Sequence, residues 1–418
     1  MFYSLLRCHH DLNTRKTLSR KLSRRFRLFY MNNVFSKNPD LICLSHLRWD
    51  FVFQRPQHLM TRFAKQGRVF YVEEPVLTEE AERMECEQRE SGFYLVVPHL
   101  RADESGQTMT EKMAQMLSEL LRKYDICSYH LWYYTPMAIP WTAHLKPIAT
   151  VYDCMDELSA FQGAPTELKL REQELFRRAD LVFTGGYSLF DAKRSLHPNV
   201  YAFPSSIDVS HFARARSITT EPEDQSSLPH PRIGYCGVID ERMDLDLLAG
   251  IAQRRPNWQL VMVGPVAKIA HDLLPRGDNI HYLGMKSYDE LPGYMSGWDV
   301  AILPFAKNES TRFISPTKTP EYLAAGKPVI STAISDVVRP YGISGLVHIA
   351  ETPDDFVSAI EEVLTAGGGN NLQRVDDFLS QNSWSQTWGR MAELLEDASQ
   401  KSRPQAVAAY SAAAGSRA

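Results

Sequence analysis

The chain has 418 residues, of which 44% are hydrophobic and 23% are charged, with a formal net charge of −4. This balance is ordinary for a soluble globular protein and argues against a molecule that binds nucleic acid over its whole surface. The six cysteines are scattered without the CxxC spacing of a zinc site or a dense disulfide framework, which favours a reducing cytoplasm. No run approaches the roughly 18 consecutive apolar residues of a membrane-spanning helix, and the length suffices for two domains.

Residues 1–37 are interpreted as a basic N-terminal extension. Within residues 1–30, eight arginines and lysines stand against a single acid, Asp11. Three interpretations fit this composition. Translation begins at Met31, or the segment makes peripheral contact with the anionic inner face of the cell membrane, or it directs the chain to an organelle.

Residues 38–212 are expected to form a first Rossmann-like domain. Short apolar runs predict strands at 41–44, 68–72, 94–97, 131–134, 148–152 and 181–184. Helical spacing of apolar residues predicts the intervening helices near 56–65, 110–123 and 166–178. Alternation of strands and helices predicts a parallel sheet that is covered on both faces.

A polar stretch rich in serine, proline and glutamate, residues 213–231, is predicted to link this domain to a second one. The alternating pattern restarts over residues 232–382, which predicts a second doubly wound sheet. Such sheets bind ligands at the carboxyl ends of their strands, so we expect a cleft between the two domains. A helix is expected over residues 383–400, and an Ala/Ser-rich disordered tail over residues 401–418.

The strongest chemical signal lies within residues 308–332. A helix is predicted over residues 316–325, and Gly326 ends it. The free N–H groups and positive dipole end of this helix would face the mouth of the sheet and favour a phosphate. Lys318 opposes the dipole in the first turn, so a phosphate ligand explains its placement. Glu321, one turn later, can accept two hydrogen bonds from a sugar diol.

Residues 315–329 resemble the nucleotide-sugar-binding segment of GT-B glycosyltransferases of the family 4 type, and read Ser-Pro-Thr-Lys-Thr-Pro-Glu-Tyr-Leu-Ala-Ala-Gly-Lys-Pro-Val. The resemblance implies that Glu321 holds the ribose hydroxyls and that the helix start holds the diphosphate. The family also has a glutamate eight positions earlier, near the reacting sugar, where this chain has Phe313. The donor-binding residues implied by position are Gly237, Met285, Lys286, Ser315, Pro316, Thr317, Lys318 and Glu321.

The glycine at 237 follows the first predicted strand of the second domain, where a diphosphate can approach the backbone closely. The family places an arginine directly after this glycine, but the chain has Val238 there. A basic clamp is therefore expected from Arg242, Lys318 or Arg312. A solvated turn is the alternative interpretation for Arg242.

Met285 and Lys286 follow the strand predicted at 280–283, where the family receives the nucleobase. We expect them to line the base site, with a plain loop as the alternative. Because the family recognises the base mostly through its backbone, these side chains do not indicate which base is bound.

In the first domain, a loop dense in polar and aromatic residues follows the first strand, and Asp50, Gln54 and Arg55 are the candidates to hold an acceptor. Its Trp-Asp-x-x-x-Gln-Arg-Pro-Gln pattern resembles a bacterial subgroup tied to cell-surface and exopolysaccharide assembly. Without that resemblance, Arg55 fits better as a group at a helix end.

Three carboxylates, Asp153, Asp156 and Glu157, follow the strand predicted at 148–152. A metal site like the acidic motif of the GT-A fold is one interpretation. The preferred one is that Asp153 faces the cleft and orients the transferred sugar, while Asp156 or Glu157 favours a helix start. His130 could reach the same place, although a histidine in an aromatic strand is more often packed than catalytic.

The resemblance therefore implies an α/β protein of the GT-B fold, with two Rossmann-like domains facing across a cleft and the helix at 383–400 crossing back to the first domain. It implies a cytoplasmic hexosyltransferase of class EC 2.4, without metal or cofactor. This enzyme would move a sugar, with retention, from a nucleotide-diphosphate sugar to a glycan or lipid-linked acceptor in cell-surface polysaccharide synthesis. The residues expected to act in catalysis are Lys318, Arg242, Asp153 and His130.

Two rival functions fit the same fold. One is a nucleotide-sugar epimerase or hydrolase, which needs no acceptor. The other is a non-catalytic subunit that binds a nucleotide sugar but has lost the basic clamp.

Overall fold

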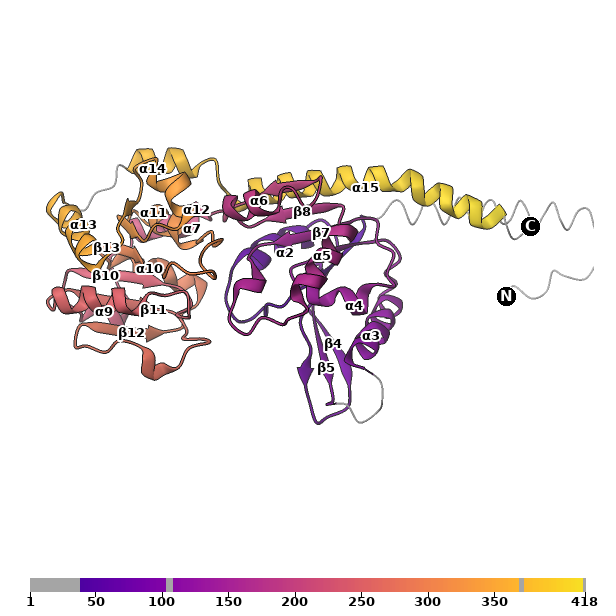
Figure 1. The fold of residues 1–418 in the computed structure, drawn as a ribbon, viewed down its shortest axis with the longest axis horizontal. Helices are drawn as coiled ribbons and strands as arrows, with labels where there is room; N and C mark the ends of the chain where they lie inside the picture. The colour runs from indigo at the N-terminus through magenta and orange to yellow at the C-terminus, as the bar shows by residue number, and fades with distance from the viewer. Residues whose placement is uncertain (1–37, 103–107, 368–371, 416–418) are drawn as a thin grey trace, which may run out of the picture.

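The computed structural model describes residues 38–102, 108–367 and 372–415, with side chains described as far as Lys401. The predictions made for residues 1–37 therefore lie outside the described residues. Figure 1 shows two α/β units side by side, linked near the top of the view.

The first unit contains a nine-stranded sheet, counted over the described residues, with the strand order β3-β5-β2-β1-β6-β7-β8-β9 and with β4 paired antiparallel to β5. Its strands are β1 (Asp40–Leu44), β2 (Val69–Val72), β3 (Val76–Leu77), β4 (Arg83–Glu90), β5 (Phe93–Leu100), β6 (Tyr129–Tyr133), β7 (Thr150–Cys154), β8 (Leu181–Thr184) and β9 (Val200–Ala202). The central strands are parallel and buried on both faces, which explains their continuous apolar runs. The polar strand β4 and the short strands β3 and β9 lack such runs and were not predicted.

Helices cover both faces of this sheet, as the alternating pattern predicted. They are α2 (Arg55–Ala64), α3 (Met109–Lys123), α4 (Ile139–Thr142), α5 (Leu168–Arg178) and α6 (Tyr187–Lys193). Two apolar clusters, one on each face, share the sheet between them.

The second unit contains a parallel sheet with the order β12-β11-β10-β13-β14-β15. Its strands are β10 (Arg232–Cys236), β11 (Gln259–Val263), β12 (Ile280–Gly284), β13 (Val300–Leu303), β14 (Val329–Ser331) and β15 (His348–Ile349). Its helices are α9 (Leu245–Arg254), α10 (Leu291–Ser296), α11 (Lys318–Ala324), α12 (Ser335–Val337), α13 (Pro353–Thr365) and α14 (Leu372–Leu379). The strand β10 begins the sheet at its centre, so that β11 and β13 flank it and their carboxyl ends open to one side.

The chain crosses between the units earlier than predicted. Helices α7 (Val209–Ala213) and α8 (Glu223–Ser226) lie in the stretch before β10, and Ile207, Phe212 and Ala215 belong to the core of the second unit. The stretch predicted as a linker, residues 213–231, is therefore part of that unit. This stretch is polar because most of it lies at the surface. The buried apolar residues of the crossing segment are spaced too widely to form an apolar run in the sequence.

The crossing segment is hydrogen-bonded to the segment by which the chain returns. The Ile207 amide donates to the Asn382 carbonyl at 3.1 Å, and the Trp384 amide donates to the Ile207 carbonyl at 3.4 Å. The Ser206 hydroxyl reaches Asn382 Oδ1 at 3.1 Å and Thr387 Oγ1 at 2.6 Å. The two segments that connect the units are thus hydrogen-bonded to each other side by side.

The two units also contact each other near these connecting segments. The Ser205 hydroxyl donates to the Ser315 carbonyl at 2.8 Å. Asp336 of α12 accepts a hydrogen bond from the Ser188 amide, at the start of α6, at 2.9 Å. The arrangement of the two sheets is therefore held on one side by direct polar contacts.

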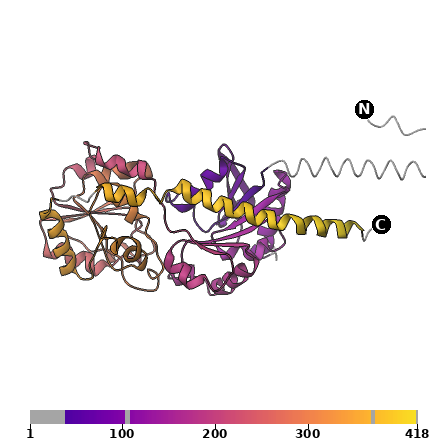
Figure 2. The same ribbon diagram turned by 90° about the horizontal axis from the view of Figure 1, so that it is seen from above.

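After the return, helix α15 (Trp384–Gly415) runs along the first unit, as Figure 2 shows from above. Its residues Trp384, Met391 and Leu395 join the apolar cluster that contains Leu59 and Phe63 of α2. Helix α15 continues through residues 401–415, part of the stretch for which a disordered tail was expected, and the alanine-rich sequence there has a high helix propensity. Residues 416–418 lie outside the described residues.

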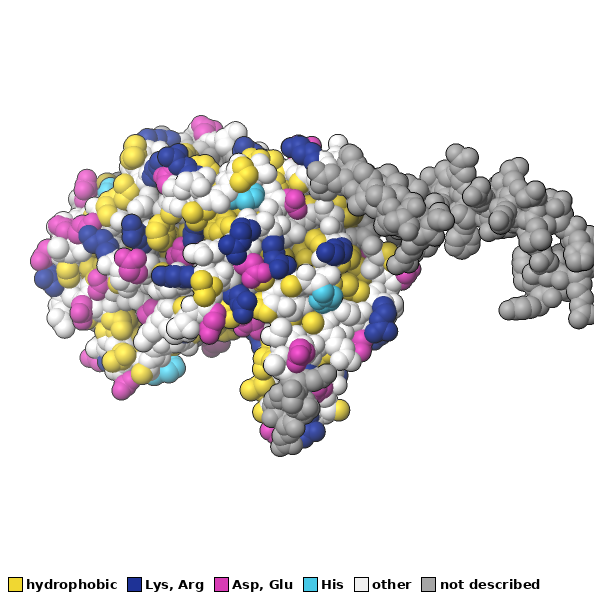
Figure 3. Space-filling model, turned by 45° about the vertical axis from the view of Figure 1, so that its right-hand side comes forward, with side chains coloured by type: hydrophobic (Ala, Val, Ile, Leu, Met, Phe, Trp, Pro, Cys, Tyr) yellow, Lys and Arg dark blue, Asp and Glu magenta, His cyan; other side chains and the backbone are white. Residues whose placement is uncertain are grey.

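Charged side chains of both signs are interspersed over the face drawn in Figure 3, which agrees with the small net charge. Among the helices that the structure describes, none is long and apolar enough to span a bilayer.

A buried ion pair fixes the start of α2 against the first sheet. Arg55 donates to both carboxylate oxygens of Asp153 at 2.8–3.1 Å, and its third contact is the Phe203 carbonyl at 2.7 Å. Asp153 is fully buried and Arg55 nearly so. A pair of this kind is costly to break from one side, because the remaining charge stays buried.

Replacing Arg55 with methionine should therefore lower the free energy of unfolding by about 3–5 kcal/mol, measured by chemical denaturation. The matched control is Arg83→Met, which removes an exposed ion pair with Glu80 and should change stability little. The double variant Arg55→Met/Asp153→Leu should regain part of the loss. An Arg55→Met protein as stable as the unaltered one would contradict this account of the pair.

Candidate functional site

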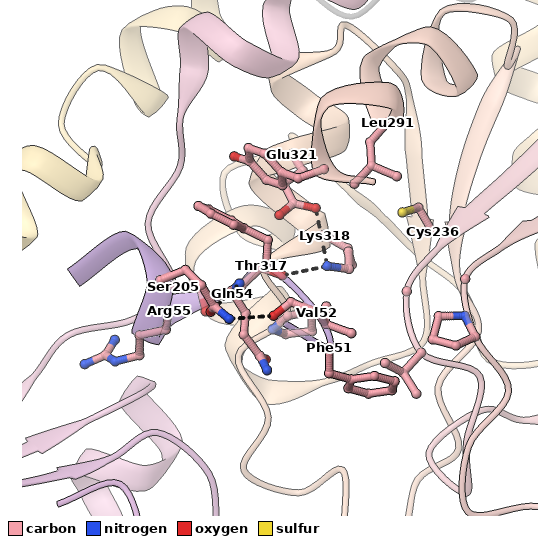
Figure 4. A pocket seen from close by; sticks show the side chains of 18 of the residues that line it. Phe51, Val52, Gln54, Arg55, Ser205, Cys236, Leu291, Thr317, Lys318 and Glu321 are labelled. Atoms are coloured by element: carbon pink, nitrogen blue, oxygen red, sulfur yellow. Dashed lines mark hydrogen bonds and ion pairs between the residues drawn. The ribbon is translucent and has the colours of Figure 1, made fainter. Parts of the chain in front are cut away.

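A cavity of about 540 Å³ lies between the two units, and Figure 4 shows part of its lining. One wall comes from the carboxyl ends of β10 and β11 and from the start of α11. The other comes from the loop after β1 and from the residues that follow β7. The predicted residues that line it are Asp50, Gln54, Arg55, Gly237, Arg242, Met285, Lys286, Ser315, Pro316, Thr317, Lys318 and Glu321.

Two glycines shape the wall of the second unit. The Gly237 amide donates to the Val263 carbonyl at 2.9 Å, which brings the ends of β10 and β11 together. Gly264 has φ +138°, and a Cβ placed there would lie 1.9 Å from the Gly237 carbonyl oxygen. At Gly237, where φ is +159°, an added Cβ would lie 2.8 Å from the Tyr235 hydroxyl oxygen and 3.2 Å from Lys318 Cε. Both positions therefore require glycine, and they leave the backbone bare toward the start of α11.

Helix α11 is locked onto the end of β10 by one side chain. The buried Tyr322 hydroxyl accepts from the Cys236 amide at 2.7 Å and donates to the Cys236 carbonyl at 3.1 Å. The helix begins at Lys318, two residues later than predicted, and so Pro316 and Thr317 form the turn before it. This lock sets the position of Lys318 and Glu321 relative to the glycine turn.

Glu321 is the most informative group in the cavity. It is 8% exposed, and its Oε2 is buried without a hydrogen-bond donor in the part of the chain that the structure describes. Lys318 Nζ lies 3.5 Å from this oxygen and donates to Thr317 Oγ1 at 3.0 Å (Figure 4). Burial raises the pKa of the Glu321 carboxyl, and the charge of Lys318 offsets part of that rise. A buried carboxylate with unused acceptor capacity is suited to a ligand that brings hydroxyl donors.

The other cations of the second wall already have partners. Arg242 binds both oxygens of Asp240, the shortest contact being 2.6 Å. Burial opposes the charge of Arg242, but its bonds to Asp240 outweigh this and raise its pKa. Lys286 is bonded to Asp224 at 2.6 Å, whereas Met285 beside it is half exposed. Lys318 is therefore the cation of this wall that lies closest to the glycine turn without a strong carboxylate bond.

Two of the four residues expected to act in catalysis lie outside the cavity. Asp153 was expected to face the cleft, but it is fully buried against Arg55 and does not line the cavity. His130 was a catalytic candidate, but it is buried and its Nε2 lies 2.8 Å from the hydroxyl of Ser399 in α15. The alternative interpretation, a packed histidine, therefore describes its position. Arg55 reaches the lining, but its guanidinium points away from Lys318 and Glu321 (Figure 4).

The acid that reaches the cavity from this part of the chain is Asp156, for which a helix start was the preferred interpretation and a metal site the alternative. Its neighbour Glu157 is bonded to Lys193 at 2.7 Å and turns away. The sequence signal that could have found Asp156 is its place two residues beyond β7, where the chain leaves the sheet at its carboxyl end.

The loop after β1 supplies the facing rim. Asp50 is exposed and forms an ion pair with Arg89 at 3.1 Å. Gln57 holds the loop by donating to the carbonyls of Trp49 and Val52 at 2.7 and 3.0 Å. Among the described residues, no three His, Cys, Asp or Glu side chains are grouped so that they could hold a metal ion.

Residues 230–366 match the family model described as Glycosyl transferases group 1. A relative, the putative teichuronic acid biosynthesis glycosyltransferase TuaH of Bacillus subtilis (strain 168), is 26% identical over 257 residues. The match covers 54% of this chain and 63% of TuaH, so it spans less than two thirds of the relative.

Solved structures share the arrangement of both units at low identity. Sucrose-phosphate synthase from Thermosynechococcus elongatus gives a TM-score of 0.66 at 15% identity, over 86% of this chain and 99% of that one. HepE from Anabaena, in complex with UDP and glucose, gives 0.61 at 13% identity, over 86% and 100%.

The two sheets and the cleft between them therefore define a protein of the GT-B fold, as the sequence predicted. Within that class, residues 230–366 of the second unit match the group 1 glycosyltransferase model, and this range includes residues 315–329, where the resemblance was noted.

The close approach at Gly264 has a measurable consequence. Gly264→Ala should lower the free energy of unfolding by about 1–3 kcal/mol more than Gly163→Ala, because only the first methyl collides with backbone. Gly163 is the matched control, since it also has a positive φ, +77°, but has nothing within 4 Å of the added Cβ. Equal losses in chemical denaturation would show that the contact between the two turns is not tight.

Proposed function

We propose that the protein is a glycosyltransferase that moves a sugar from a nucleotide-diphosphate sugar to a glycan or lipid-linked acceptor. The single observation that carries this proposal is the buried Oε2 of Glu321, which lacks a hydrogen-bond donor among the described residues and lies beside the bare glycine turn. A ribose diol would supply the missing donors, and the diphosphate would then lie between Gly237 and the start of α11.

In this proposal Lys318 is the main electrostatic group. Charge develops on the diphosphate as the bond to the sugar breaks, and a cation already in place stabilises that charge without reorganisation. Lys318 Nζ donates to the neutral Thr317 Oγ1 at 3.0 Å, and its contact with Glu321 Oε2, at 3.5 Å, is looser than the 2.6 Å bond between Arg242 and Asp240. Arg242 would contribute less, because Asp240 already neutralises it.

The donor and the pathway are proposed from the similar proteins. HepE was solved with UDP and glucose, which supports a uridine nucleotide sugar as the donor. The name of TuaH refers to teichuronic acid biosynthesis, which supports a role in cell-surface polysaccharide synthesis. Retention of configuration and independence of metals and cofactors are proposed from the family resemblance alone.

The acceptor would enter from the wall of the first unit, past Asp50 and Gln54. Both residues line the cavity, and their loop is braced by Gln57. A braced rim can position a hydroxyl group and exclude water that would otherwise hydrolyse the donor.

A second candidate function is a non-catalytic subunit that binds a nucleotide sugar. The observation that favours it is the pairing of Arg242 with Asp240 and of Lys286 with Asp224, which leaves one strongly available cation on the wall. Binding of the donor without any turnover, with or without cell-derived acceptors, would identify this function.

The donor site is tested by thermal shift with UDP, GDP, ADP and their common sugar conjugates, because a ligand of the folded state raises the melting temperature. Glu321→Gln should weaken binding of the best nucleotide at least tenfold, since it loses charge-assisted bonds worth about 1.5–3 kcal/mol. Glu309→Gln is the matched control, because Glu309 is exposed and forms an ion pair with Arg312 at 3.7 Å. Unchanged affinity in Glu321→Gln would remove the central assignment.

We also propose that residues 1–30 hold the protein peripherally at the cytoplasmic face of the membrane, because their basic composition suits anionic lipid. Deleting them should reduce co-sedimentation with phosphatidylserine vesicles and leave nucleotide binding unchanged. Partition equal to that of the full chain would exclude a lipid role. Vesicles of phosphatidylcholine alone provide the control for charge.

A further inference from the structure

Asp156 is a carboxylate in the cavity without an assigned role. It follows β7, which lies between β6 and β8 in the first sheet, and lines the wall opposite α11. Within the described residues, no hydrogen bond or ion pair of its carboxylate is present at ordinary distances. The side chain is partly buried, so water does not surround its carboxylate as it surrounds an acid on the open surface.

The other acids that line the cavity either contact a cation or are exposed at the edge of the cavity. Glu321 sits against Lys318 on the opposite wall. Asp50 is exposed and paired with Arg89, and Glu90 is exposed beside it. Asp156 is therefore the remaining interior acceptor with capacity for a ligand on the wall of the first unit.

On the wall of the second unit, Glu321 is the one acid among the described residues that line the cavity. Phe313, before the turn that leads into α11, packs against the apolar cluster of the first unit that contains Tyr133 and Leu189. Glu309 is exposed, pairs with Arg312 at 3.7 Å and does not line the cavity. A sugar carried on the diphosphate would thus find its carboxylate on the first unit.

The charges around Asp156 come from both units. Burial raises its pKa, and the charges of Arg242, Arg55 and Lys268 oppose that rise. Arg55 is bound to Asp153, and Arg242 is bound to Asp240, so neither cation neutralises Asp156 by direct contact. The carboxylate is placed to accept hydrogen bonds from hydroxyl groups, which need no charge of their own.

We propose that Asp156 accepts a hydrogen bond from a hydroxyl of the transferred sugar and so orients it across the cleft. This inference rests on the proposed function, because it requires a nucleotide-sugar donor whose diphosphate lies at the glycine turn. It makes Asp156 the residue that distinguishes a sugar conjugate from the plain nucleotide. It also assigns the sugar contact to the first unit, while the nucleotide is held by the second.

The test compares the affinity for each sugar conjugate with that for its nucleotide, using UDP-glucose and UDP, GDP-mannose and GDP, and ADP-glucose and ADP. Asp156→Ala should reduce the preference for the best conjugate about tenfold or more, and leave the affinity for its nucleotide unchanged. Asp156→Asn keeps a weaker, neutral acceptor, so its preference for the conjugate should lie between those of the unaltered protein and Asp156→Ala. Asp278→Ala is the matched control, at an exposed aspartate outside the cavity.

The outcomes separate this inference from the proposed function. If the unaltered protein binds none of the six compounds, the proposed function fails and the inference fails with it. If it prefers a conjugate and Asp156→Ala keeps that preference, only the inference fails. Equal loss for conjugate and nucleotide would show a structural role, which also contradicts the inference. Should Asp156→Ala not fold, the near-isosteric Asp156→Asn decides by the same comparison.

Discussion

The bond between the Tyr322 hydroxyl and the backbone of Cys236 is the contact on which the site depends. It joins a short helix, α11, to the end of the central strand β10 through both the amide and the carbonyl of one residue. A seven-residue helix has little stability of its own, so its position is set by this tertiary contact. Lys318 and Glu321 are aimed at the glycine turn because Tyr322 is fixed there.

Burial determines the chemistry of the groups so positioned. Glu321 is nearly buried and one of its oxygens has no hydrogen-bond donor among the described residues, whereas Arg242 has its charge matched by a neighbouring acid. The same contrast holds in the first unit, where Asp153 is ion-paired with Arg55 and Asp156 faces the cavity. In both units the carboxylate available for a ligand is one that keeps hydrogen-bond acceptor capacity within the described part of the chain.

Much of the fold could be predicted from the sequence, because strands buried on both faces appear as apolar runs. The runs at β1 and β11 are of this kind. The strand β4 could not be found in this way, since its exposed side chains follow no apolar pattern. The glycine turn and the segment around Glu321 could be located because their motif is local.

The error over Asp153 has a different origin. Which of two nearby acids faces the cavity depends on Arg55, which is 98 residues away in the sequence and is brought close only by folding. The position of His130 likewise depends on Ser399, at a separation of 269 residues. Local patterns carry no information about such partners.

The paired connections between the units limit how they can move. A single flexible connection would let one unit twist and swing freely about the other. Here the segments at Ile207 and Asn382 are hydrogen-bonded side by side, so bending them together leaves mainly one axis of rotation. Any opening or closing of the cleft would then be a rotation about this axis. Each time the cleft closed, the same residues of the two walls would face each other.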